Sequence, residues 1–165
     1  MKPIAALFFA TAGLVLSAAA VAVPARAQQN PFAIPAAYTA QSKTAMSITG
    51  TVRFSSKNIS IHGKLYPLTL THTLTAAELT DAKKLFSIDT ATSGFLYKTS
   101  IPANAPMLNG NTLCGATCTW VLAVYTAPDQ LNLSFITGAA TPSLAPGALM
   151  NSSDVSGTYW YAKQR

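Results

Sequence analysis

Ionisable side chains are scarce in this chain, which limits the chemistry it can carry. Only five of its 165 residues are acidic: Glu78, Asp81, Asp89, Asp129 and Asp154. Glu78 and Asp81 fall in a predicted helix, and Asp129 follows Pro128 in a predicted turn. No G-x-S-x-G motif precedes a predicted helix. We therefore predict that the protein is not an enzyme and has no catalytic residues. A small hydrolase is the third functional hypothesis, after a binding module and a hydrolase inhibitor.

The two histidines are a weak set of metal ligands. His62 lies in a predicted turn, and His72 lies on a predicted strand in phase with Leu70 and Leu74. A zinc site needs three or four ligands, and no acid precedes Glu78 in this part of the chain. We predict neither a metal nor a cofactor.

Cysteine is equally scarce, since Cys114 and Cys118 are the only two. In an oxidising compartment such a pair favours a disulfide across a tight turn, and the small loop it closes gives a stabilisation of about 2 kcal/mol. Thiol–disulfide enzymes have two residues between their cysteines and a helix after them, whereas here three residues intervene and a strand follows. We predict a structural disulfide; free or intermolecular thiols and a redox pair are the alternatives.

A long apolar run occurs once, at the N-terminus. Met1-Lys2 is followed by an apolar segment over 4–23, by Pro24 and by Ala25-Arg26-Ala27. This pattern is typical of a Sec-type signal peptide (residues 1–27) cleaved after Ala27, and it predicts a periplasmic or secreted protein. An uncleaved membrane anchor is the alternative because the run could span a bilayer, but the proline and the A-x-A site favour cleavage. After cleavage no stable membrane span is predicted.

The net charge of +6 for the whole chain overstates that of the exported product. Loss of Lys2 and Arg26 leaves nine basic and five acidic residues, a net charge of +4. Only Lys83 and Lys84 are adjacent, which argues against nucleic acid as a partner. A mild positive field favours an anionic envelope polymer or an envelope protein.

Residues 28–43 are rich in alanine and proline and predict a flexible N-terminal tether before a single β-rich domain over 44–165. Within the domain, the alternation of apolar and polar residues indicates seven strands, at 46–54, 59–61, 65–74, 94–101, 119–126, 130–137 and 157–163. The strand at 119–126 is apolar on both faces and is expected to be central. Thr75 and Glu78 form a capping box that begins a short helix at about 75–86. The expected fold is mainly β, a small antiparallel sandwich or open barrel with about seven strands and one helix.

An aromatic triplet, Tyr159-Trp160-Tyr161, lies in the last strand. Because side chains alternate along a strand, Trp160 lies on one face and both tyrosines on the other. One face is expected in the core, and the other is a candidate platform that stacks on sugar rings or anchors a protein; ordinary edge-strand packing is the alternative. With Asn109 and Asn111 of the loop over 102–112, these residues form the predicted binding surface.

Residues 108–115 (LNGNTLCG) carry an N-G-N-x-L-C-G motif, and residues 48–54 (ITGTVRF) match an I-T-G-x-V/I-x-F strand. In these two segments the chain resembles a group of uncharacterised small exported proteobacterial proteins. The proteins of the group have a second cysteine near the C-terminus, which this chain lacks. The resemblance therefore implies that Cys118 replaces it as the disulfide partner of Cys114. The resemblance implies export and no particular activity.

Two functional hypotheses follow. The leading one is an exported, non-enzymatic envelope protein that acts as a binding or interaction module. The alternative is an inhibitor of a secreted or periplasmic hydrolase, acting through the loop at 102–113 or the loop at 138–156.

Overall fold

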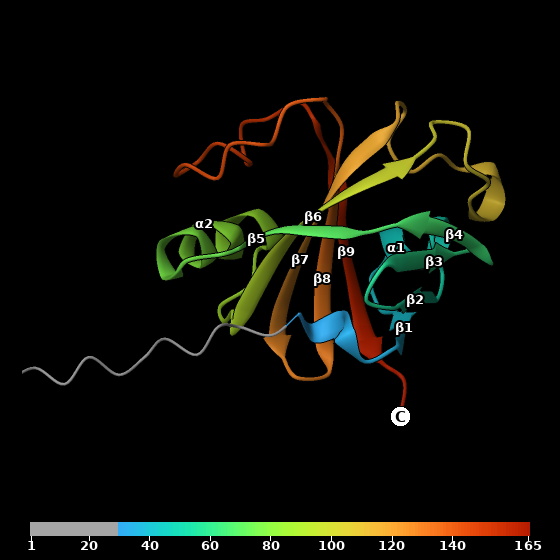
Figure 1. Cartoon of the computed structure of the whole chain (residues 1–165), viewed down its shortest axis with the longest axis horizontal. Helices are drawn as coiled ribbons and strands as arrows, with labels where there is room; N and C mark the ends of the chain where they lie inside the picture. The colour runs from blue at the N-terminus through green and yellow to red at the C-terminus, as the bar shows by residue number, and fades with distance from the viewer. Residues whose placement is uncertain (1–29) are drawn as a thin grey trace, which may run out of the picture.

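Nine antiparallel strands form one sheet that curves into a nearly closed barrel (Figure 1). The computed structural model describes residues 30–165, so the predicted signal peptide lies outside the described residues. The strands are β1 (Ala36–Ala40), β2 (Val52–Phe54), β3 (Asn58–Ile61), β4 (Lys64–Pro67), β5 (Thr69–Thr73), β6 (Ser93–Ile101), β7 (Cys118–Ala127), β8 (Gln130–Ile136) and β9 (Val155–Lys163). The helices are α1 (Lys43–Ile48) and α2 (Ala76–Phe86), with 3-10 turns η1 (Pro31–Ala33) and η2 (Leu108–Gly110).

One continuous segment brings the two ends of the sheet together. The strand order is β4-β3-β2-β1-β9-β8-β7-β6-β5, so β4 and β5 are the terminal strands although only Leu68 separates them in sequence. β4 pairs with β3 and β5 pairs with β6. The Thr99 hydroxyl of β6 also donates to the Pro67 carbonyl oxygen at 2.7 Å. The prediction of a small mainly-β fold is confirmed.

The predicted tether is wrong for the described part of residues 28–43. Phe32 is fully buried and stacks on Phe54 with ring centroids 3.8 Å apart. The Asn30 side-chain oxygen accepts hydrogen bonds from the Phe32 amide and the Tyr97 hydroxyl. β1 follows and pairs with both β2 and β9. This segment is ordered by long-range aromatic and strand contacts, which its alanine-rich composition does not reveal.

The predicted strand at 46–54 is wrong in its first half, because residues 46–48 are the end of α1 and residues 49–51 form a turn. The Ser42 hydroxyl oxygen accepts from the Ala45 amide at 3.2 Å and caps the helix, and Ala45 is fully buried. Gly50, with φ +58°, ends the turn in a conformation that glycine adopts without strain. β2 therefore starts only at Val52. The count rises from seven strands to nine because β1 lies in the predicted tether and the predicted strand at 65–74 divides at Leu68.

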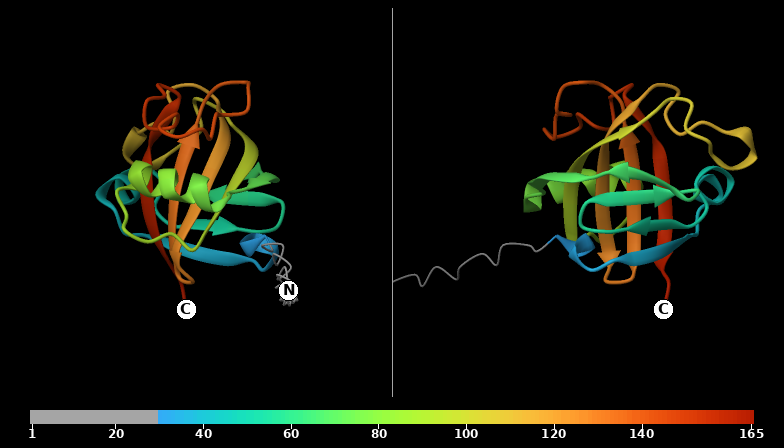
Figure 2. Two further views of the ribbon diagram at one scale, coloured as in Figure 1. Left: turned by 90° about the vertical axis from the view of Figure 1, so that its left-hand side faces the viewer. Right: turned by 45° about the vertical axis from the view of Figure 1, so that its right-hand side comes forward.

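α2 has the predicted bounds and the predicted capping box between Thr75 and Glu78. It crosses the outer face of β7 and β8 (Figure 2), where its buried residues Ala82 and Phe86 belong to one apolar cluster with outward-facing residues of those strands. The alternate residues of β7 point into the barrel and join the main core. β7 is thus buried on both faces, as its sequence predicts.

Side chains fill the barrel and close both of its ends. Phe32 and its aromatic neighbours occupy one end. At the other, the loop between β6 and β7 buries Ala105, Met107 and Leu113 in the same core. The predicted disulfide, Cys114–Cys118, is present with an S–S distance of 1.97 Å and ties this loop to the start of β7.

Candidate functional site: a groove on the outer face of β8 and β9

The aromatic triplet has the predicted alternation, but only one member reaches the surface. Tyr159 and Tyr161 are at most 1% exposed, so their place in the predicted binding surface is wrong. Burial raises the pKa of Tyr159 to about 12. The Tyr161 hydroxyl is hydrogen-bonded to Thr49 Oγ1 at 2.6 Å. Trp160 points the opposite way and is 43% exposed.

Asn109 and Asn111 are exposed but serve a different part of the surface. Each donates a side-chain N–H to the Ser47 carbonyl oxygen, at 3.2 Å and 2.9 Å. They therefore fasten the loop between β6 and β7 to α1. Neither lines the groove beside Trp160, so the predicted five-residue surface does not form.

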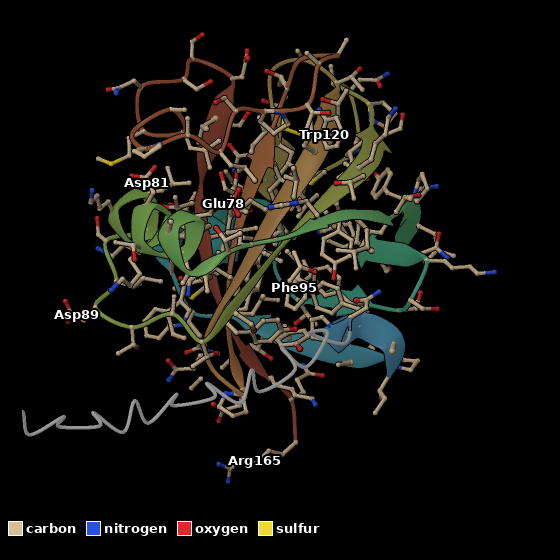
Figure 3. The ribbon with its side chains drawn as sticks, turned by 60° about the vertical axis from the view of Figure 1, so that its left-hand side comes forward. Glu78, Asp81, Asp89, Phe95, Trp120 and Arg165 are labelled. Carbon is tan, nitrogen blue, oxygen red and sulfur yellow. A yellow bond between two sulfur atoms is a disulfide. The ribbon has the colours of Figure 1, made fainter. Side chains whose placement is uncertain are left out.

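A groove of about 600 Å³ lies between the outer face of the sheet and the segment that follows α2. Its floor consists of side chains from β7, β8 and β9: Thr126, Gln130, Asn132 and Thr158. Trp160 and Ser42 form one wall, and residues 86–90 form the other. Figure 2 (left) shows α2 in front of these strands, and Figure 3 places Asp89 on the loop after the helix.

Asn132 holds the one buried polar side chain of the groove floor. It lies directly opposite Trp160 on β9 and opposite Val124 on β7, so its amide and the indole are neighbours across the strand pair. Asn132 is 5% exposed, and its Nδ2 has no hydrogen-bond partner among the described residues. An unpaired buried donor costs about 1–3 kcal/mol. The groove thus contains a hydrogen-bond donor that the fold does not satisfy.

The backbone beneath Trp160 is fixed by the corner between β1 and α1. The Trp160 amide donates to Ser42 Oγ at 3.2 Å, and the Gln41 amide donates to the Trp160 carbonyl oxygen at 2.8 Å. Ser42 Oγ also caps α1. Because Ser42 Oγ is the acceptor in both of these hydrogen bonds, its own proton is available to a ligand in the groove.

The opposite wall is set by the way α2 ends. Ser87 has φ +52° in the left-handed region. Its amide donates to the Lys84 carbonyl oxygen, and the Ile88 amide donates to that of Lys83. This is the hydrogen-bond pattern of a Schellman motif. It turns the chain back toward the sheet and places Asp89 at the groove.

The groove is neutral except for one carboxylate. Of its described lining residues, none is lysine, arginine or histidine, and Asp89 is the only acid. Hydroxyl and amide side chains predominate, and the indole of Trp160 supplies an apolar surface beside them. Such a set can orient a ligand by hydrogen bonds around one aromatic contact.

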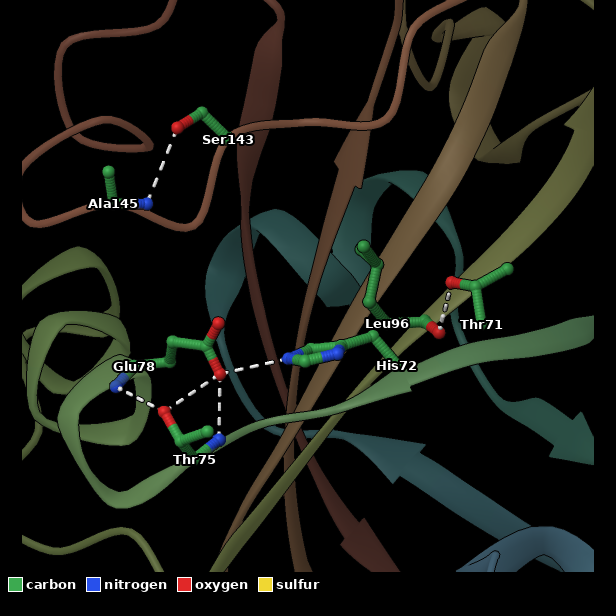
Figure 4. Close-up of polar contacts among 7 residues, drawn as sticks. All are labelled: Thr71, His72, Thr75, Glu78, Leu96, Ser143 and Ala145. Carbon is green, nitrogen blue, oxygen red and sulfur yellow. Dashed lines mark hydrogen bonds and ion pairs between the residues drawn. The ribbon is translucent and has the colours of Figure 1, made fainter.

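The two histidines do not enter the groove and do not meet. His72 Nε2 lies 2.9 Å from Glu78 Oε2, which also accepts from the Thr75 amide and hydroxyl (Figure 4). Burial raises the pKa of Glu78, but the hydrogen bonds from His72 and Thr75 outweigh burial and hold it below its usual value. His62 has φ +55° in the turn between β3 and β4 and lines a separate hollow with Arg53. Within residues 30–165 no group of three or more His, Cys, Asp and Glu is placed to hold a metal ion.

Sequence reasoning identified Trp160 but missed Asn132 and Asp89. Asn132 lies between two inward-facing leucines on its strand, so its outward position could be predicted from the sequence. Its burial could not be predicted, because it depends on which strands pair with β8 and place Val124 and Trp160 beside it.

No helix in the described part of the chain is long and apolar enough to cross a membrane. Comparison with protein-family models, with curated proteins and with solved structures finds no match for this chain.

Proposed function

We propose that this protein is an exported, non-enzymatic binding module of the cell envelope, and that its ligand binds in the groove beside Trp160. The observation that carries the proposal is the pairing of an exposed indole with a buried, unsatisfied amide on adjacent strands. A bound ligand would cover the first and provide a hydrogen-bond partner for the second. Export rests on the signal-peptide pattern of residues 1–27.

The groove is built on fixed elements, which supports a preformed binding site. Its floor belongs to the sheet, and its walls are held by the Ser42 hydrogen bonds and by the Schellman motif after α2. A site built on fixed elements loses little conformational entropy when it binds a ligand.

The alternative, an inhibitor of a secreted hydrolase, has less support because both candidate loops are tied to the domain. Asn109 and Asn111 hold the first loop to Ser47. The Gly147 amide donates to Asp81 Oδ2 at 2.8 Å and holds the second loop against α2. An inhibitory loop that inserts into an enzyme cleft has to project from its scaffold.

Retention on envelope material tests the proposal. The purified exported protein is mixed with sacculi, membrane fractions and soluble periplasmic extract, and binding is measured by sedimentation and by cross-linking. The variant Thr158→Trp fills the groove from an exposed position on β9. Its matched control, Thr69→Trp, makes the same change at an exposed position on β5, outside the groove.

We expect one envelope fraction to retain the wild type and Thr69→Trp and not to retain Thr158→Trp. The proposal is wrong if no fraction retains the wild type, or if the same fraction retains both tryptophan variants equally.

A further inference from the structure

We infer that the ligand of this groove is a neutral oligosaccharide, one sugar ring of which stacks on Trp160 while an oxygen accepts a hydrogen bond from Asn132. This inference rests on the proposed function and specifies its ligand class.

The unsatisfied group disfavours a ligand whose polar groups are all cationic donors. Asn132 Nδ2 is a donor without a partner, so the ligand has to supply an acceptor. An ammonium group has three donors and no acceptor lone pair. A cation at Asp89 would therefore leave the buried amide unpaired, and the positive net charge of the chain opposes its approach.

The charge of the groove disfavours an anionic ligand. A carboxylate or phosphate could accept from Asn132, but no described lining residue is basic, and Asp89 would repel it. Arg53 lies in the separate hollow with His62. Lys83 and Lys84 are nearer, in a neighbouring hollow that shares Asp89 with the groove wall, but they do not line the groove itself. The anionic envelope polymer suggested by composition is thus a poor match for this groove.

The floor of the groove disfavours a peptide bound as an added strand. β8 is paired with β7 and β9, and β9 is paired with β8 and β1. Their backbone groups are used within the sheet, whereas strand addition requires an exposed edge.

A sugar ring fits the groups that remain. Its hydroxyl oxygens can accept from Asn132 and from the free proton of Ser42, and its hydroxyl protons can donate to the Asp89 carboxylate. Its apolar face matches the indole of Trp160, which is 43% exposed and held by the hydrogen bonds to Ser42 and Gln41.

Titration calorimetry with defined oligosaccharides tests the inference. The probes are neutral tetrasaccharides of glucose and of N-acetylglucosamine, with both α- and β-linked glucose. Polygalacturonate and an uncharged peptide mixture represent the other classes. We expect at least one neutral tetrasaccharide to bind and Trp160→Ala to weaken it at least tenfold. The control Leu65→Ala removes another exposed apolar side chain, on β4, and should leave the affinity unchanged.

Asn132→Leu separates a binding role from a structural one. It keeps the size of the side chain and removes the unpaired donor. We expect about tenfold weaker binding, which corresponds to about 1.4 kcal/mol, with a urea midpoint that is unchanged or higher. Weaker binding with a clearly lower midpoint would make Asn132 a structural residue and overturn its role as a contact.

The ligand class and the proposed function fail in different ways. If no neutral tetrasaccharide binds while Thr158→Trp still abolishes retention on envelope fractions, the groove binds another class and the inference is overturned alone. Groove-dependent binding of polygalacturonate or of a peptide has the same consequence. If no envelope fraction retains the protein and no probe binds, both are overturned.

Discussion

Phe32 is expected to be one of the most important residues for stability, although it lies in the segment that its composition assigns to a tether. Its side chain is fully buried. It stacks on Phe54 at 3.8 Å and meets the edge of Tyr38 with ring centroids 6.4 Å apart. Truncation of a buried phenylalanine to alanine costs about 3–5 kcal/mol. Because a domain of this size has a free energy of unfolding of about 5–15 kcal/mol, Phe32→Ala should remove a large part of it.

Urea unfolding of the purified protein, followed by tryptophan fluorescence and circular dichroism, measures this loss. With a slope of about 2 kcal/mol per molar urea, a loss of 4 kcal/mol lowers the midpoint by about 2 M. The matched control is Ile34→Ala, two residues along the chain and 76% exposed, which should change stability by less than about 0.5 kcal/mol. Equal midpoints for the two variants would refute the packing of η1 into the barrel and restore the tether.

Three further predictions concern single contacts. Asp81→Ala removes the acceptor of the Gly147 amide, so the loop between β8 and β9 should open more often and hydrogen exchange at Gly147 should quicken about tenfold or more; unchanged exchange would show that this bond does not hold the loop. The lowered pKa of Glu78 contributes stability that is complete above its unfolded value near 4.5 and is lost as the pH falls through the folded-state value. Urea midpoints between pH 3 and 6 should therefore decline less steeply toward acid in Glu78→Gln, and parallel curves would contradict this sign. Replacement of both Cys114 and Cys118 by serine should lower the free energy of unfolding by about 2 kcal/mol, the chain-entropy value for so short a loop, and a thermal scan showing no change would rule out that contribution.

Elements that depend on local sequence were predictable. The capping box of α2 needs only Thr75 and Glu78, three residues apart. The hairpin of β7 and β8 is indicated by two apolar runs around Pro128-Asp129, and its strands agree with the predicted ranges within about two residues. The disulfide, with three residues between its cysteines, is local as well.

Elements that depend on distant partners were not. β1 and α1 are short, and neither has an apolar period long enough to identify it. Both owe their stability to tertiary contacts: η1 before β1 packs through Phe32, and Thr49 at the end of α1 bonds to Tyr161, 112 residues further along. Met46 and Ile48 fit a strand pattern, but the Ser42 cap and the burial of Ala45 decide for a helix.

The candidate groove shows the same division. Strand periodicity alone placed Trp160 on the face opposite Tyr159 and Tyr161, because side chains alternate along any strand. It could not decide which face was buried, since both carry aromatic residues. Barrel closure buried the tyrosines, strand pairing placed Asn132 beside Trp160, and the path of the chain after α2 added the opposite wall of the groove. The sequence by itself determined the faces of the strands, while only the tertiary structure determined which face is buried in the barrel and which lines the groove.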